Sequence, residues 1–455
     1  MSYDSSTVLG WRHPNNTMTL EAQTPKTLEV CEEQQEFNWR QCWYPICFVQ
    51  DLPQNRPYAF SLYDEPFVLF RNLEGILVCL TDRCPHRAAK LSDGKVIDGK
   101  IECSYHGWQF GIDGQCLHIP QLPTDATIPV NACVQSFPVI ERQGLIWMWP
   151  GNAQTAMADL IPTIADLEQP EFVYTDYIRD LPYDQAYLIE NFVDPAHVYI
   201  SHDGTEGNRQ NAQPLAMEVS DFSAKGFRGK MRPANNPHGV WQNLDFIAPN
   251  LVHYRLNFKP GWYAGIALYS IPLGKGRCRL LLRRYRNFRT QAMKLKPRWL
   301  EHFRQNKVLE QDLPQIVGQQ AEIARSQQNL NQVYLPLKTS DLLVISYRKW
   351  LDKFGDALPY YQGYFTSKDF DHHSIPDSNR FLQHTLICNS CNRAYRLISQ
   401  LKQVCIGVAI ALAALAIITE GIVSNISVSL SLVSVLIAFG LAKLKTHFQY
   451  SHTHF

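Results

Sequence analysis

The chain opens with a polar segment and then alternates short apolar runs with turn residues. Residues 1–35 carry no regular spacing of apolar positions, so we expect a variable segment there. From residue 36 to residue 150, runs such as Phe67–Phe70, Ile76–Leu80 and Leu145–Trp149 follow one another with Asn, Gly or Pro between them. Short apolar and aromatic runs broken in this way are typical of β-strands. The pattern predicts a small all-β domain over residues 36–150.

From residue 151 to residue 370 the pattern changes to helical segments and longer strands. A helical stretch at Tyr187–Ser201 comes first, and a long helical segment from Arg298 to about Asn329 comes last. Between them lie strand-like runs at Leu251–Phe258, Tyr263–Leu273 and Arg279–Arg286. Strands followed by a helix favour an α+β domain with an antiparallel sheet.

Two uncharged runs, Val404–Thr419 and Ile422–Ala442, dominate the C-terminal end. Each is near the length of about 20 residues with which a helix crosses a bilayer. Only Glu420 and Gly421 separate them, and Lys or Arg residues flank the pair on both sides. By the positive-inside tendency both flanks face the cytoplasm. We expect a linker over residues 371–401, a transmembrane hairpin over residues 402–446 and a solvated tail over residues 447–455; the alternative is a buried helical pair in a soluble core.

Composition narrows the function classes. A chain of 455 residues favours two or three domains. Lys and Arg number 43 against 42 Asp and Glu, so no excess of positive charge indicates nucleic-acid binding. The twelve cysteines are scattered, which favours a reducing compartment where thiols bind metals or take part in redox chemistry. The first residues contain no apolar core of a secretory signal and do not resemble a transit peptide.

Two boxes in the predicted β domain mix cysteine with histidine. Cys84 and His86 form the first box, and Cys103 and His106 form the second. In a Rieske 2Fe-2S cluster two thiolates hold one iron and two imidazoles hold the other. A structural zinc ion also takes two Cys and two His, but its motifs more often pair Cys with Cys and His with His. The mixed boxes therefore favour a Rieske cluster over zinc.

A second histidine pair follows in the predicted catalytic domain. His197 ends the segment Glu190–His197, and His202 comes five residues later. Non-haem Fe(II) oxygenases hold their iron with two histidines and one carboxylate. In a continuous helix these histidines would differ by about 500° of rotation, so they need a local irregularity to converge. Asp312 and Glu310, in a later helix, are the candidate carboxylates. Alternatively, either residue is a surface acid in a polar helix and binds no metal.

The sequence around the cluster boxes resembles one branch of Rieske proteins. Rieske subunits of cytochrome complexes carry an additional cysteine in each box, and these cysteines form a disulfide across the cluster. Ala89 and Tyr105 stand at the corresponding positions here. The chain therefore resembles the oxygenase or ferredoxin branch.

Longer motifs resemble the pheophorbide a oxygenase family, which includes chlorophyllide a oxygenase and a Rieske protein of the chloroplast inner-envelope translocon. The motifs are WYPI at 43–46, CPHRAAKLSDG at 84–94, ECSYHGWQF at 102–110, CLHIPQ at 116–121, ENFVDPAHVYISHDG at 190–204, CNSC at 388–391 and the terminal hairpin. The resemblance implies a Rieske domain, a helix-grip-like catalytic domain of antiparallel sheet and helix, and a membrane anchor. With no transit peptide expected, it suggests a cyanobacterial homologue in the thylakoid or plasma membrane, with the catalytic domains on the cytoplasmic side.

The resemblance also implies roles for individual residues. Rieske oxygenases place their third iron ligand on a late helix, which makes Asp312 our choice and Glu310 the second choice. The acid before the first iron histidine, Asp194 here, would link a cluster histidine of one subunit to His197 of its neighbour, as in a head-to-tail trimer.

A pair of late cysteines completes these expectations. Cys388 and Cys391 form a C-x2-C pair, which can close a small disulfide. In the family such a pair is associated with thioredoxin control, whereas two inert cysteines before a membrane span are the alternative.

Taken together, the resemblance implies an oxygenase with one 2Fe-2S cluster and one mononuclear Fe(II). It would use O2 and electrons from ferredoxin or a similar donor to oxidise a chlorophyll-related tetrapyrrole. Two alternatives remain open: a redox-sensing or electron-transfer membrane component without turnover, and a Rieske oxygenase of a sterol or other lipid.

Overall fold

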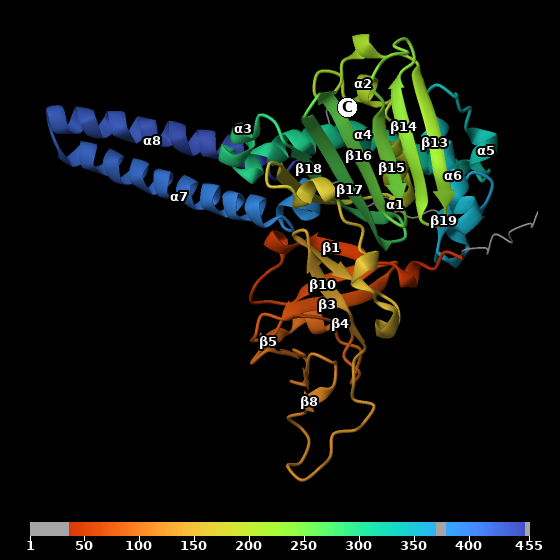
Figure 1. Cartoon of the computed structure of the whole chain (residues 1–455). Helices are drawn as coiled ribbons and strands as arrows, with labels where there is room; N and C mark the ends of the chain where they lie inside the picture. Colours follow the sequence, from red (N-terminus) through yellow and green to blue (C-terminus); the bar gives the residue numbers. More distant parts are fainter. Residues whose placement is uncertain (1–35, 370–378, 451–455) are drawn as a thin grey trace, which may run out of the picture. The chain divides into compact units, whose positions relative to one another are not determined.

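The computed structural model describes residues 36–369 and 379–450. The variable segment expected over residues 1–35, part of the linker and the last residues of the tail, 451–455, lie outside the described residues. The expected fold class is confirmed: an all-β part, a sheet-and-helix part and two long apolar helices follow one another along the chain. Figure 1 shows this order of elements.

Residues 44–148 form three small antiparallel sheets. The sheet orders are β1-β11-β10, β2-β3-β4-β9 and β5-β6-β7-β8. The strands are β1 Tyr44–Phe48, β2 Tyr58–Leu62, β3 Glu65–Arg71, β4 Leu77–Thr81, β5 Lys95–Ile97, β6 Lys100–Glu102, β7 Gln109–Phe110, β8 Cys116–His118, β9 Ser136–Phe137, β10 Val139–Arg142 and β11 Leu145–Met148. Alternate residues of β3 and β4, among them Val68, Phe70 and Leu80, are buried in one core with Ile101 and Phe110. This core lies beside Cys84 and Cys103, so it supports the loops that carry both cysteines.

The following part is built on one seven-stranded antiparallel sheet, in the order β12-β18-β17-β16-β15-β14-β13. Its strands are β12 Val173–Leu181, β13 Leu215–Ser223, β14 Gly226–Pro233, β15 Gln242–Ile247, β16 Leu251–Lys259, β17 Trp262–Gly274 and β18 Arg277–Arg286. Helices α1 Gln185–Val193, α4 Arg298–Ser326 and α6 Leu342–Phe354 pack against it (Figure 1). Shorter helices complete the part: α2 Val198–Ser201, α3 Thr290–Leu295 and α5 Leu330–Val333.

The helix expected over residues 187–201 is in fact interrupted. Helix α1 ends at Val193, and Asp194 has an extended backbone with φ −98° and ψ 99°. Pro195 follows, and a residue before proline is pushed out of the helical region by the proline ring. Helix α2 then begins after His197 and ends before His202. The sequence therefore builds in the irregularity that the histidine pair needs.

Helix α4 behaves differently at its own proline. A proline inside a helix usually kinks or breaks it, but α4 continues from Arg298 to Ser326 with Pro314 inside it. Leu309, Leu313 and Ile316 are buried on one face of the helix. Packing of this face against the sheet compensates for the hydrogen bond that proline cannot donate.

The two C-terminal helices, α7 Asn389–Ile418 and α8 Ile422–Thr446, lie side by side (Figure 1). Gly421, with φ 68°, makes the short connection in a conformation that L residues rarely adopt. Both helices are long and apolar enough to cross a membrane, with mean hydropathy of 2.3 and 2.2, and their apolar side chains are mostly exposed. Helix α7 begins well before the apolar run, so the second half of the expected linker is helical, preceded by the π-helical turn Phe381–Thr385.

Candidate metal centres

Two short loops carry the four residues of the expected cluster. The first loop follows β4 and closes with hydrogen bonds from the Cys84 amide to the Ala89 carbonyl and from the Ala88 amide to the Cys84 carbonyl. The second follows β6 and closes in the same way, from the Cys103 amide to the Trp108 carbonyl and from the Gly107 amide to the Cys103 carbonyl. Each loop therefore presents one cysteine and one histidine from a rigid turn.

The imidazoles of the two loops meet. The ring centroids of His86 and His106 lie 4.4 Å apart, and Trp108 stacks on His86 at 4.7 Å with an interplanar angle of 2°. The Nδ1 atom of His86 is buried and has no hydrogen-bond partner among the described residues. A buried nitrogen with a free lone pair is what an iron ligand requires. These residues therefore fit the group that the sequence predicts.

A two-iron cluster and a single zinc ion need different spacings of their ligand atoms. Among the described residues, two groups place three or more ligand atoms all within 4.8 Å of one another, and neither contains a residue of the two cluster loops. A single tetrahedral ion needs all four ligand atoms at that separation. A 2Fe-2S cluster instead spreads the thiolates and imidazoles over two irons.

One of those converging groups comprises His197, His202 and Asp312. The interruption between α1 and α2 turns both imidazoles toward α4, where Asp312 is buried. The Oδ2 atom of Asp312 lies 3.1 Å from Nε2 of His202 and 4.0 Å from Nε2 of His197. Two imidazoles and one carboxylate around one point form the ligand set of a non-haem Fe(II) oxygenase.

A hydrogen bond from Nδ1, the nitrogen that faces away from Asp312, orients each of these imidazoles. Nδ1 of His197 donates to the backbone carbonyl of Asp194 at 2.6 Å. Nδ1 of His202 donates to the side-chain oxygen of Gln311 at 3.2 Å, and the Thr205 hydroxyl donates to the same oxygen at 2.8 Å. Such hydrogen bonds select the tautomer whose Nε2 faces the metal.

Electrostatics favour charge on His197 when no metal is bound. Burial opposes its charged form, but the hydrogen bond to Asp194 and the charge of Asp312 outweigh burial, so the pKa of His197 is raised. Iron must bind a neutral imidazole, so it competes with a proton at this residue.

Glu310, our second choice for the third iron ligand, lies in a different environment. Glu310 pairs with Arg179, with 3.0 Å between Oε1 and Nη1, and with Arg380 through both of its oxygens. Both arginines are fully buried. Glu310 thus neutralises buried charge, and Asp312 alone of the two joins the histidines.

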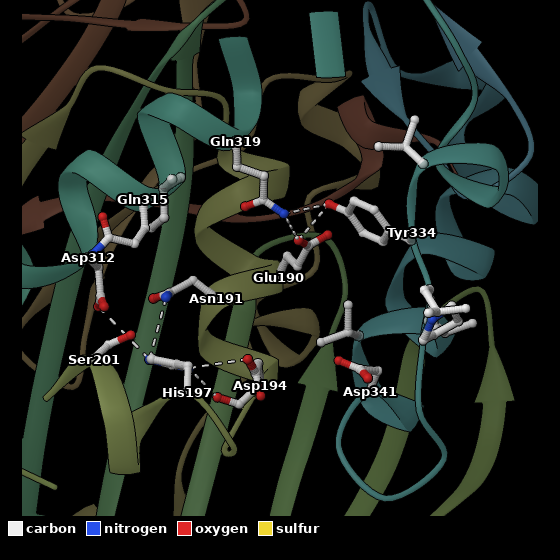
Figure 2. Close-up of a pocket in the computed structure, with 16 residues that line it drawn as sticks. Glu190, Asn191, Asp194, His197, Ser201, Asp312, Gln315, Gln319, Tyr334 and Asp341 are labelled. Carbon is white, nitrogen blue, oxygen red and sulfur yellow. Dashed lines mark hydrogen bonds and ion pairs between the residues drawn. The ribbon is translucent and has the colours of Figure 1, made fainter. Parts of the chain in front are cut away.

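A cavity of about 510 Å³ opens beside His197 and Asp312 and is within the ordinary size range of ligand pockets. His197 and Asp312 lie on its wall, together with Asp194 (Figure 2). Figure 2 also shows Glu190, Gln319 and Tyr334 joined by hydrogen bonds further along the wall. Val333, Leu335, Pro336, Val344 and Ile345 supply the apolar lining on that side.

Sequence reasoning missed several residues that the structure brings to these sites. Gln311 is adjacent to Asp312 in sequence, but no motif marks it. Two further histidines, His302 and His384, join Cys388 and Cys391 in the other converging group. They come from separate segments, so no local spacing could have revealed them.

Comparison with known proteins gives matches over both parts of the chain. The family model described as Rieske [2Fe-2S] domain matches residues 42–138, and the one described as Pheophorbide a oxygenase matches residues 246–329. Protein TIC 55 of Pisum sativum is 34% identical over 424 residues, covering 85% of this chain and 76% of the relative. Pheophorbide a oxygenase of Oryza sativa subsp. japonica is 31% identical over 454 residues, covering 91% and 84%.

Solved structures show the same fold. Dicamba monooxygenase bound to dicamba superposes with a TM-score of 0.59 at 22% identity, covering 70% of this chain and 97% of that chain. The NdmA QL mutant of Pseudomonas putida CBB5 with theobromine gives a TM-score of 0.58 at 26% identity, covering 69% of this chain and 90% of that chain.

Proposed function

Because the chain belongs to the family of Rieske non-haem iron oxygenases that includes pheophorbide a oxygenase and TIC 55, we propose that it oxidises a chlorophyll-related tetrapyrrole with O2 and electrons from a ferredoxin-type donor. The observation that carries this proposal is the joint position of His197, His202 and Asp312 beside the cavity. A three-ligand metal site next to a ligand-sized space suits turnover of a substrate.

The chain's own residues have separable tasks in this reaction. Cys84, Cys103, His86 and His106 would hold the 2Fe-2S cluster, which supplies electrons when bound. His197, His202 and Asp312 would hold Fe(II) and leave positions open for O2. Gln311 and the Asp194 carbonyl orient the two imidazoles, while the cavity wall positions the substrate.

The cavity mouth favours a large apolar substrate. Leu335 lines the cavity and is 91% exposed, and Val333 beside it is also exposed. Exposed apolar side chains at a pocket often bind an apolar ligand. The two apolar helices add to this, because a tetrapyrrole partitions into membranes and an anchored oxygenase meets it there. We propose that the hairpin spans the membrane with both ends on the cytoplasmic side.

Electron delivery is proposed to occur between subunits. The Asp194 side chain is 25% exposed, and its Oδ2 lies 3.5 Å from Nδ1 of His197. Its Oδ1 accepts the Ala196 amide at 2.8 Å, which holds the carboxylate in place. A cluster histidine of a second copy could donate to this carboxylate in a head-to-tail trimer.

The thioredoxin control expected for Cys388 and Cys391 stays a prediction; both thiols are buried, so a reductant would reach them only after local opening.

The test is turnover by the purified full-length protein in detergent. With ferredoxin, a ferredoxin reductase and O2, we expect oxidation of pheophorbide or chlorophyllide but not of a sterol. Oxidation of the sterol alone would move the substrate class to lipids. Cluster reduction and reoxidation without any oxidised product would instead favour an electron-transfer component.

A further inference from the structure

A second group of converging metal-ligand atoms lies away from the iron site. It comprises His302 in α4, His384 in the π-helical turn, and Cys388 and Cys391 at the start of α7. All four side chains are buried, and their ligand atoms lie within 4.8 Å of one another. Sγ of Cys391 is 3.2 Å from Nε2 of His384 and 3.3 Å from Nδ1 of His302, while Sγ of Cys388 is 3.5 Å from Nδ1 of His302.

Both imidazoles are held with a free lone pair toward the sulfurs. Nε2 of His302 donates to the Asp176 carbonyl at 2.8 Å, and Nδ1 of His384 donates to the Ile178 carbonyl at 2.5 Å. Both carbonyls belong to β12, so one strand fixes both tautomers. Histidine ligands of metals are oriented by hydrogen bonds of this kind.

We propose that His302, His384, Cys388 and Cys391 bind one Zn²⁺ ion in a closed tetrahedral site. At Zn–S and Zn–N distances of about 2.3 Å and about 2.1 Å, the corners of a tetrahedron lie roughly 3.4–3.8 Å apart. The sulfur–nitrogen distances given above need only small shifts to reach that geometry. Two Cys and two His are a structural zinc set, and with no position left for water the ion would have no catalytic role.

Charge supports the same ion. Two thiolates and one Zn²⁺ sum to zero, which suits a buried position. The nearby ion pair of Arg298 and Asp51 has no net charge, with 2.6 Å between Nη2 and Oδ2. Without a metal, the sulfurs would be thiols that donate weak hydrogen bonds to the imidazoles. Hydrogen bonds alone could therefore also hold these side chains together, and the measured metal content decides between a zinc site and a metal-free cluster.

The site would fix the base of the hairpin to the catalytic sheet. Helix α4 and strand β12 hold the histidines, and α7 begins at the cysteines. The Asn389 amide, between the two cysteines, donates to Oδ1 of Asp51 at 2.8 Å, next to the Arg298 pair. A metal at this point links the segment that enters the membrane to the domain that holds the iron. While bound, the ion would also keep Cys388 and Cys391 from forming a disulfide, so this site is an alternative to the thioredoxin control expected for the pair.

The first test is metal analysis of the full-length protein purified in detergent without added zinc. We expect about one zinc per chain in the wild type and in the control Cys405→Ser, whose cysteine lies further along α7. The double variant Cys388→Ser/Cys391→Ser, and His302→Gln, should lose the zinc and keep the Rieske EPR signal. The variant Cys84→Ser/Cys103→Ser should keep the zinc, which places the metal outside the cluster loops. Zinc retained in Cys388→Ser/Cys391→Ser, or zinc absent from the wild type, would overturn the proposal.

A second test needs no variant and so does not depend on variants that fold. Replacement of zinc by Co²⁺ in the wild type should give the intense visible bands of a tetrahedral ion, with thiolate charge-transfer bands in the near ultraviolet. Mass spectrometry after alkylation should show both thiols protected until a chelator is added under denaturing conditions. A Cys388–Cys391 disulfide in the protein as isolated, or the weak spectrum of octahedral cobalt, would contradict the site.

Discussion

The Oδ2 atom of Asp312 lies 3.1 Å from Nε2 of His202, and both side chains are buried. Asp312 in α4 and His202, which directly follows α2, meet there because α1 ends before Asp194 and α4 continues past Pro314. Because Nδ1 of His202 is hydrogen-bonded to Gln311, Nε2 of His202 and Oδ2 of Asp312 face each other.

Removal of a ligand should empty the mononuclear site selectively. We expect His197→Ala, His202→Ala and Asp312→Ala each to abolish turnover and to lower iron content by about the one mononuclear iron. The Rieske EPR signal should persist, because the cluster uses other residues. Iron analysis together with low-temperature EPR checks this; full iron occupancy in Asp312→Ala would remove Asp312 from the ligand set.

The residue that orients His202 should tune metal affinity. Gln311→Leu removes the acceptor of the His202 Nδ1–H and of the Thr205 hydroxyl. Loss of such a partner typically weakens metal binding by about 10- to 100-fold. Gln311→Glu keeps an acceptor and should restore most of the affinity. Titration of apoprotein with Fe(II) measures both; equal affinities for Gln311→Leu and the wild type would show that this hydrogen bond is irrelevant.

Glu310 should matter for stability rather than for iron. Glu310→Ala leaves Arg179 and Arg380 buried without this carboxylate, and breaking a buried pair in this way costs about 3–5 kcal/mol. The midpoint of thermal unfolding, followed by circular dichroism, should fall clearly. The control Glu322→Ala removes an exposed partner of Arg325 on the same helix and should change little. A stable Glu310→Ala protein that lacks mononuclear iron would reverse the assignment of the carboxylate.

Asp194→Asn should separate metal content from electron transfer. The amide oxygen of asparagine can still accept the Ala196 amide, so the turn should persist. Neither proposed ligand set includes Asp194, so we expect iron and sulfide to be retained. The charge that would hold imidazoles of both sites is lost, and reoxidation of the cluster in a single turnover should slow severely. Asp341→Asn, at another carboxylate on the cavity wall, is the matched control and should reoxidise normally. Normal reoxidation in Asp194→Asn would remove the argument for a head-to-tail trimer.

Local pattern predicted those features that depend on neighbouring residues. The strands around Phe67 and Leu251, helix α4 and the terminal hairpin follow from runs of apolar residues. The interruption between α1 and α2 was not predicted, because the expectation was one helical stretch over Tyr187–Ser201, although Asp194 preceding Pro195 carried a local signal for it. The two candidate cluster boxes could be proposed from sequence because each loop holds its cysteine and its histidine within a few positions.

What sequence could not predict depends on contacts between distant segments. The continuation of α4 through Pro314 depends on the buried face around it, which outweighs one missing hydrogen bond. His302 and His384 acquire meaning only when β12 places them beside Cys388 and Cys391. Glu310 and Asp312 look alike in sequence, and only their surroundings in the fold distinguish them: buried arginines around Glu310, and two histidines beside Asp312.

The most direct test of the central claim is a single turnover under ¹⁸O₂. Wild-type protein with its cluster reduced is mixed with ¹⁸O₂ and pheophorbide a, and the EPR signal and the product are followed together. The account predicts that the Rieske signal disappears at the rate at which ¹⁸O-labelled product forms, and that in Asp312→Ala the signal persists with no product. Cluster reoxidation at the same rate in Asp312→Ala, or a product without ¹⁸O, would contradict it.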